Sequence, residues 1–428
     1  MANRYWIGGA PAVAQVSTVQ ITGNDASTTY KLTVGSITVS CTGAGSAALT
    51  ATALAAAWEA STHSYFSGVT ASANSDTVTL TSDNAGVPFT ATSSVTGGAG
   101  TIGSVTAVTA NSGPNVFGTA LNWSGGTAPT NGDSIVIGNS AFDILFDLDQ
   151  SGSTFASVTI VEAFDDGMIG LDPNVFQVTA STTDTTVREY RECYLKCGAT
   201  IFINRSKTPR TLVNFGSVQT TATITDSAGS AEDGEGLEPI RLLGTHASNA
   251  LHVSGGIVGV ATTQQVVEVS TFATVSANAP ESSTFSAAGT PPAVNLGAGC
   301  TLTTINVGNA TVTNFGAAAT TVTVTDPDGQ YVCYGTGAHT TVTNRGSVIY
   351  RSSGTLTTYT GAGTLDLSFD TRAKTITNCT IYSGATLNAN TGAPLSVTFT
   401  NGIDLAGCGL ADVTLDVGPH VTLTPSAI

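Results

Sequence analysis

The sequence predicts a mainly β protein, in which a small α+β module near the N-terminus is followed by a single-stranded β-helix or β-solenoid. Three observations support this fold class. Gly numbers 48 and charged residues make up 10% of the chain, a composition that favours strands and turns. From residue 134 onward, short apolar pairs such as Val158–Ile160 and Val322–Val324 recur between polar turns. An internal repeat carries Asn-x-Gly turns. An array of β-sandwiches is the alternative architecture.

The first part of the chain reads as an arm followed by a compact module. We assign residues 1–11 to an N-terminal arm and residues 12–109 to the α+β module. A helix is expected near 46–60, because Ser46 can cap it and Ala is the best helix former. One such helix would cover one face of an antiparallel sheet. Period-two alternation places strands near residues 13–21, 30–34, 37–41, 69–73, 77–81 and 88–92.

A Gly- and Pro-rich connection, residues 110–133, follows the module. It contains Trp123-Ser124-Gly125-Gly126, which echoes Trp6-Ile7-Gly8-Gly9 at the start of the chain. We infer that the module is inserted into one opening motif, so that the two Trp-Gly-Gly pieces meet in space. Trp6 and Trp123 are therefore candidate interface residues, with a role in the local core as the competing interpretation.

Residues 134–428 are expected to form a β-helix-like rod. Within them, Asn214–Asp226 and Asn314–Asp326 are identical at eight of thirteen positions, at an offset of 100 residues. A weaker echo begins at Asn344. In a β-helix, Asn and Gly can supply left-handed backbone at the corners, while Thr and Val stack from coil to coil.

The net charge and the N-terminal sequence limit which partners and which compartment we expect for the chain. The net charge of −16 would repel a phosphate backbone, so we expect no nucleic-acid partner. No apolar run approaches the ~20 residues that span a bilayer, so we expect no membrane partner. Met1–Gly9 lacks the apolar segment of a secretory signal, which predicts synthesis and folding in a cytosol. In that compartment the seven Cys are expected to be buried thiols rather than disulfides.

The sequence offers little support for a catalytic or metal-binding site. Paired acids such as Asp147 and Asp149 could serve general acid–base cleavage of a polysaccharide, but solvated turn carboxylates are the simpler interpretation. The loops 232–238 and 326–329 could hold Ca²⁺, with plain loops favoured. No His spacing fits a catalytic zinc. We therefore predict no enzyme, no catalytic residue, no cofactor and no metal. The acids considered are Asp143, Asp147, Asp149, Asp165, Asp166, Glu232, Asp233, Glu235, Glu238, Asp404, Asp412 and Asp416.

The basic residues are unevenly distributed. Residues 32–187 contain no Lys or Arg, and six of the 13 basic residues then fall within 23 positions. This basic band consists of Arg188, Arg191, Lys196, Arg205, Lys207 and Arg210. We predict that it docks onto an acidic surface of a neighbouring subunit or of a larger partner assembly, since such charges set partner choice and orientation. The competing interpretation is a solvated stripe that Glu189 and Glu192 balance locally.

Two parts of the first third of the chain resemble known proteins. The segments Phe66–Ala73, Thr77–Thr81 and Ala85–Thr92 resemble a small module of virion structural proteins of tailed bacteriophages. The opener Arg4–Gly9, with Asn122–Pro129 and Gly132–Ile137, resembles the start of phage and bacterial surface proteins that continue as β-helices. The remaining two thirds of the chain resemble such proteins only in general sequence pattern.

The resemblance implies a non-enzymatic structural component of a tailed-phage virion, most simply a capsid-decorating protein. It would form a homotrimer, bind the major capsid protein or other virion proteins, and reside in a virion assembled in the host cytoplasm. The expected lack of a secretory signal disfavours a bacterial surface adhesin, which is one alternative. The other alternative is a tail fibre or tailspike that binds or cleaves host polysaccharide.

Overall fold

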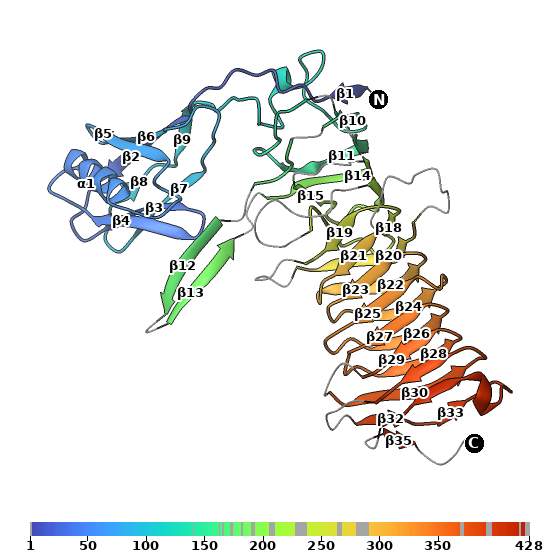
Figure 1. Ribbon diagram of the computed structural model, residues 1–428. Helices are drawn as coiled ribbons and strands as arrows, with labels where there is room; N and C mark the ends of the chain where they lie inside the picture. The colour runs from blue at the N-terminus through green and yellow to red at the C-terminus, as the bar shows by residue number, and fades with distance from the viewer. Residues whose placement is uncertain are drawn as a thin grey trace.

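The protein is mainly β (Figure 1). A computed structural model describes residues 2–138, 140–161, 163–164, 167–171, 174–180, 183–189, 193–204, 210–226, 238–262, 268–279, 291–368, 372–390, 396–418 and 421–423. Within these residues there is one α-helix, and most strands belong to a single long parallel sheet. Two short 3-10 helices, η1 (Ala120–Asn122) and η2 (Leu410–Asp412), lie in loops.

The module contains two antiparallel sheets rather than the single sheet expected. The first has the order β5 (Val69–Asn74), β6 (Thr77–Ser82), β2 (Val16–Gly23) and β8 (Thr101–Ile102), with β9 (Thr106–Thr109) also paired to β2. The second has the order β4 (Ile37–Thr42), β3 (Thr29–Val34) and β7 (Ala91–Thr96). Strands β8 and β9 are not among those that the sequence predicts, because they are short and carry no clear alternation.

The helix α1 (Ala47–Glu59) lies within the range 46–60 that the sequence predicts. The Ser46 hydroxyl accepts a hydrogen bond from the Leu49 N–H at 3.3 Å, which caps the first turn. Leu54 and Trp58 are fully buried in the module core. The strand expected at 88–92 begins only at Ala91, because the Gln15 side chain binds both the N–H and the carbonyl of Phe89 in place of a strand partner.

The long sheet has 25 described strands that stack one after another (Figure 1). From β14 to β30, each strand pairs in parallel with the strand two positions further along the chain, as β20 pairs with β22 and β21 with β23. Nearer the C-terminus, β31 pairs with β34 and β32 with β35. The strands are β1 (Asn3–Tyr5), β10 (Ser134–Ile137), β11 (Asp149–Ile160), β14 (Leu195–Asn204), β15 (Thr211–Asn214), β16 (Thr221–Asp226), β17 (Ile240–Leu243), β18 (Ala250–Val253), β19 (Ile257–Val260), β20 (Ser270–Ala277), β21 (Ala293–Leu296), β22 (Cys300–Val307), β23 (Thr311–Asn314), β24 (Ala318–Val324), β25 (Gln330–Cys333), β26 (His339–Asn344), β27 (Ser347–Tyr350), β28 (Leu356–Gly361), β29 (Thr364–Asp366), β30 (Lys374–Ile381), β31 (Thr386–Asn388), β32 (Val397–Phe399), β33 (Ile403–Asp404), β34 (Thr414–Asp416) and β35 (Val421–Leu423).

The core of the long sheet is built from columns of inward side chains. Register pairs place Ile305, Val322, Val342, Tyr359 and Cys379 in one column across β22, β24, β26, β28 and β30, and all five are buried. Each apolar side chain buried in this way contributes about 1.5–3 kcal/mol. The apolar pairs that recur in the sequence are therefore the buried positions of the stacked parallel strands, and the variable spacing between pairs lies in the loops.

The Asn-x-Gly turns share one hydrogen bond. The side-chain oxygens of Asn214, Asn314 and Asn344 accept the N–H of the Gly two residues later, at 2.8, 3.0 and 3.0 Å. Gly216 and Gly316 adopt positive φ angles of 59° and 128°, which Gly tolerates without cost. None of the three Asn has a positive φ. The expectation that Asn supplies left-handed backbone is therefore wrong, because Asn shapes the corner through its side chain.

We expect Asn314→Ala to lower the free energy of unfolding by about 2–3 kcal/mol, since the change leaves buried backbone donors unpaired. The fully buried Asn314 side chain accepts the N–H of Gly316 and Ala317 and donates to the Ala317 carbonyl and the Tyr331 hydroxyl. The measurement is a guanidinium titration followed by circular dichroism. Asn214→Ala is the matched control at the equivalent, half-buried position of the repeat. An equal loss in both variants would contradict this account.

An antiparallel hairpin, β12 (Asn174–Ala180) and β13 (Thr183–Glu189), leaves the sheet between β11 and β14 (Figure 1). The sequence places this segment in the rod without distinguishing it.

All seven Cys are free thiols, five of them buried. Burial raises the pKa of Cys197, Cys300, Cys333 and Cys379 to about 12, so these thiols are held in the protonated form. No helix in the described part of the chain has the length and apolar character to span a membrane.

Candidate functional site

The two Trp-Gly-Gly pieces meet at the first strands of the long sheet. Trp6 and Trp123 form an antiparallel bridge, and their rings pack edge to face with centroids 5.1 Å apart. The Trp6 indole N–H donates to the Phe142 carbonyl at 3.0 Å, and that of Trp123 donates to the Phe117 carbonyl at 2.6 Å. The predicted meeting is confirmed. Both rings are only 0–1% exposed, so the proposal that they face a partner is wrong and the local-core interpretation holds.

A carboxylate that the sequence analysis did not single out fixes the start of the chain. Asp133 accepts hydrogen bonds from the Ala2 N–H at 2.9 Å, the Arg4 Nε at 3.1 Å and the Thr130 N–H at 3.2 Å. The backbone N–H groups, followed by the Arg4 guanidinium, hold the pKa of Asp133 far below its usual range. The Gly132-Asp133 step of the opening motif was the only signal for this role. Asp133 therefore aligns β1 beside β10.

The basic band does not form one exposed surface in the described part of the chain. Lys196 on β14 pairs with Asp149 at 3.0 Å, and this contact, after the Ser151 hydrogen bond, lowers the pKa of Asp149. Arg210 is 4% exposed and donates to the Gly170 carbonyl at 2.7 Å. Arg210 is thus a structural residue, and its assignment to a docking face is wrong. Arg188 lies on β13, whose side chains are not described. Arg191, Arg205 and Lys207 lie outside the described residues.

The acidic candidates do not converge on a shared site in the described residues. Asp147 precedes β11 with a φ of 55°, so it does not alternate with Asp149 along one strand as expected. Near the C-terminus, Asp404, Asp412 and Asp416 accept hydrogen bonds from Ala406, Gly409 and Asn390, within turns or between neighbouring segments of the sheet. Among the described residues there is no group of three or more His, Cys, Asp or Glu that could hold a metal. Asp165, Asp166, Glu232, Asp233 and Glu235 lie outside the described residues.

Glu238 is the exception among the acids, because it is buried. Its two carboxylate oxygens accept hydrogen bonds from Thr262 and Asn295, both at 2.7 Å. Nearby on the same part of the sheet, the Tyr194 hydroxyl donates to Glu268 at 3.3 Å. Burial, followed by the charge of Glu268, raises the pKa of Tyr194 well above its usual value. These contacts join residues 24, 57 and 74 positions apart in the sequence, so the buried polar groups here have a positioning role.

A second polar chain lies inside the sheet further along. The Asn314 amide donates to the Tyr331 hydroxyl at 2.9 Å, and that hydroxyl lies 2.6 Å from His339 Nε2. His339 Nδ1 lies 3.2 Å from the Gly337 carbonyl. A neutral ring with its proton on Nδ1 satisfies every one of these groups. Burial lowers the pKa of His339 to about 4. No sequence pattern indicated this polar network, because only the register between strands brings its members together.

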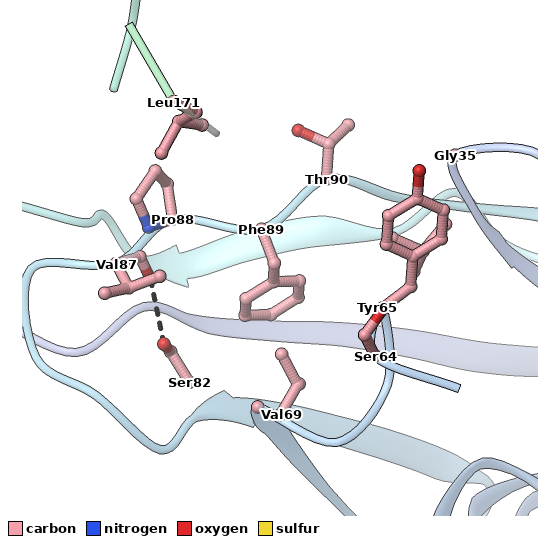
Figure 2. A pocket seen from close by; sticks show the side chains of 12 residues that line it. Gly35, Ser64, Tyr65, Val69, Ser82, Val87, Pro88, Phe89, Thr90 and Leu171 are labelled. Atoms are coloured by element: carbon pink, nitrogen blue, oxygen red, sulfur yellow. Dashed lines mark hydrogen bonds between the residues drawn. The ribbon is translucent and has the colours of Figure 1, made fainter. Parts of the chain in front are cut away.

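One shallow pocket of about 270 Å³ lies between the module and Leu171 (Figure 2). Tyr65, Phe89, Val87 and Pro88 supply most of its apolar lining. The Ser82 hydroxyl at its edge already donates to the Val87 carbonyl at 2.8 Å (Figure 2). None of the twelve lining residues is acidic, basic, His or Cys. The lining thus offers apolar and hydroxyl contacts and no acid–base pair.

Comparison with known proteins found no matching family model, no matching curated protein and no matching solved structure.

Proposed function

We propose that the chain is a non-enzymatic structural component of a tailed-bacteriophage virion, with a capsid-decorating role. The observation that carries the proposal is the parallel register of the long sheet, in which columns such as Ile305, Val322 and Val342 are buried strand upon strand. We interpret this register as a β-solenoid with two main strands per coil. A stack of this kind is stiff along its axis, because every coil is bonded and packed to both neighbours. The resemblance of the first third to virion proteins supports the same assignment.

Self-association follows from one face of the stack. Thr304, Thr321, Thr341 and Thr358 occupy one outward column on successive strands and are partly exposed. The neighbouring column holds Asn306, Thr323, Thr343 and Thr360. This Thr face carries no charge in a chain of net charge −16. Copies that approach through the Thr face therefore avoid the repulsion between their acidic surfaces. We propose that three rods pack side by side through it.

The oligomer is tested on the purified chain. We expect light scattering to give three times the chain mass of 42.9 kDa, and negative-stain images to show a rod. The double variant Thr341→Lys/Thr358→Lys should dissociate the assembly, because it buries like charges against each other. Thr386→Lys, on β31 outside the Thr face, is the control. A monomeric wild-type chain would refute the trimer without touching the decoration role.

The decoration role is tested on particles assembled without this chain. Purified chain should bind such particles and raise the temperature at which they release DNA, since it adds contacts between capsomers. Purified chain should not bind host cells. The converse result, in which cells are bound and particles are not, would replace decoration with a tail-fibre or adhesin role.

A further inference from the structure

One strand edge of the module is left bare. Strand β4 lies at the end of the three-stranded sheet and, in the described part of the chain, pairs only with β3. The N–H of Gly43, directly after β4, donates to the Thr28 carbonyl at 2.8 Å. Because the hydrogen-bonding direction alternates along an antiparallel pair, the N–H and carbonyl groups of Thr38, Ser40 and Thr42 point to the opposite edge. No hydrogen bond to these groups occurs within the described residues.

The same module covers an edge of its other sheet. Strand β5 is an edge strand of that sheet. The Trp58 indole N–H donates to the Val69 carbonyl at 2.8 Å, and the Glu59 carboxylate accepts the Ala71 N–H. Two side chains of α1 thus occupy backbone groups of β5 that would otherwise be open to another strand. Among the described residues, β4 has no such cover.

Strand β4 also lacks the features that protect an edge in natural sheets. Charged side chains, Pro and bulges are the usual means of preventing edge pairing. β4 contains none of them, and its register with β3 continues over all six residues. Residues 32–58, which include β4 and α1 up to Trp58, contain no charged residue. Depletion of charge is typical of the centre of a protein interface. The β4 edge therefore has the properties of a surface that receives another strand.

The hairpin of β12 and β13 is a sheet that lacks further strands. It stands apart from the long sheet (Figure 1), and its outer edges pair with no other strand in the described residues. A lone two-stranded hairpin is only marginally stable in water. β12 has seven residues, against six in β4, and its sequence contains no charged residue. The two strands therefore match in length and in charge.

We propose that β12 of one copy adds to the β4 edge of a second copy. The addition joins a two-stranded and a three-stranded sheet into one sheet with the order β13, β12, β4, β3 and β7. The open backbone groups of Thr38, Ser40 and Thr42 then pair with another backbone. Repeated from copy to copy about one axis, such a heterologous contact closes into a ring. The inference rests on the proposed trimer for the number of copies in this ring.

A second copy fits this edge better than an unrelated protein. The donor strand and the acceptor edge are both present in this chain, and they are not paired with each other within the described residues. The approach also avoids repulsion, since neither β4 nor β12 carries a charge in a chain of net charge −16.

The first experiment is hydrogen exchange of the purified full chain, read at the Thr38 and Thr42 amides. We expect exchange about tenfold slower in the assembled chain than in the dilute chain, because an amide within a strand ladder exchanges only after local opening. Ser40→Lys should remove this protection and raise the dissociation constant of the assembly about tenfold, since a charge on an edge strand opposes pairing. Ser40→Pro removes an outward N–H and should act in the same way.

The matched control is Ser93→Pro on β7, at the opposite edge of the same sheet. It should leave the protection of Thr38 and Thr42 unchanged. Circular dichroism of each variant separates a lost contact from a lost fold. Ser40→Lys changes an exposed side chain, so it keeps the test decisive where a proline variant does not fold. Equal protection in wild type and Ser40→Lys would overturn the β4 edge as the contact.

A photoreactive residue at Thr42 identifies the strand that adds. We expect p-benzoylphenylalanine at this exposed position to cross-link to residues 174–180 of another copy. A mixture of isotope-labelled and unlabelled chains distinguishes links between copies from links within one chain. Links to residues 174–180 of the same chain would overturn the second copy as the partner. Links to any other segment, or no links, would overturn β12 as the donor strand.

Failure of the strand addition and failure of the trimer give different results. A trimer whose Thr38 and Thr42 amides exchange as fast as in the dilute chain would refute the addition and leave the trimer intact. Protected amides in an assembly of another size would support the addition and refute the trimer. A wild-type chain that stays monomeric would refute both. Particle binding by the same variants is a separate readout of the decoration role.

Discussion

Trp123→Ala should lower the free energy of unfolding by about 3–5 kcal/mol, the range for truncating a buried Trp. The indole is fully buried, packs on Trp6 and on Phe117, and donates a hydrogen bond to the Phe117 carbonyl. Its loss opens a cavity where β1 joins β10. We therefore expect a lower midpoint in a guanidinium titration and faster protease cleavage near residues 2–9.

Two further variants locate this effect. Trp6→Ala combined with Trp123→Ala should cost less than the sum of the single changes, because the two rings share one contact. Trp58→Ala removes a Trp of equal burial that packs edge to face on Phe66 in the module, with centroids 4.7 Å apart. It should expose the module to protease and leave residues 2–9 protected. Strict additivity of Trp6 and Trp123, or cleavage near residues 2–9 in Trp58→Ala, would contradict the packing described.

Acid should destabilise the long sheet through His339. Burial lowers the pKa of His339 to about 4 from its ordinary 6.5. Between these values the unfolded chain binds the proton more readily than the folded chain, so stability falls as pH falls through this window. The contribution is intact above pH 6.5 and the loss reaches about 3 kcal/mol near pH 4. Guanidinium midpoints measured from pH 7 to pH 4 give this slope.

His339→Gln isolates the effect, since Gln does not titrate and can still hydrogen-bond to Tyr331. The variant should show a shallower fall in stability between pH 6.5 and 4, even where its stability at pH 7 is lower. His252→Gln is the control, because His252 is exposed on β18. Parallel pH curves for wild type and His339→Gln would exclude His339 as the acid-sensitive group.

The sequence predicted those features that depend on local pattern. Inward alternation such as Val322–Val324 marks strands because side chains alternate faces. The hydrogen bonds of the Asn-x-Gly corners and of the Ser46 cap join groups that are only a few residues apart in the sequence. The contact between Trp6 and Trp123 could also be predicted from the sequence, because the same short motif begins at each of these two residues.

The remaining features depend on contacts that no local pattern encodes. Phe89 leaves its expected strand because the distant Gln15 side chain satisfies its backbone. Arg210 is of a charged residue type that usually lies at the surface, but its side chain is buried against the Gly170 carbonyl. Asn314, Tyr331 and His339 come from three different strands, and the strand register brings them into one polar network. The register between strands is therefore the information that the sequence alone does not supply.

The parallel register has a consequence for how such a chain can change length in evolution. Successive partners such as Thr304, Thr321 and Thr341 are separated by 17 and 20 residues. Because β24 pairs in register with β22 on one side and with β26 on the other, a gene segment that encodes one whole repeat of strands could be duplicated or deleted while the pairing elsewhere is kept. Each such event would change the length of the stacked sheet by about 4.8 Å, so tandem duplication could set the length of the molecule in equal steps.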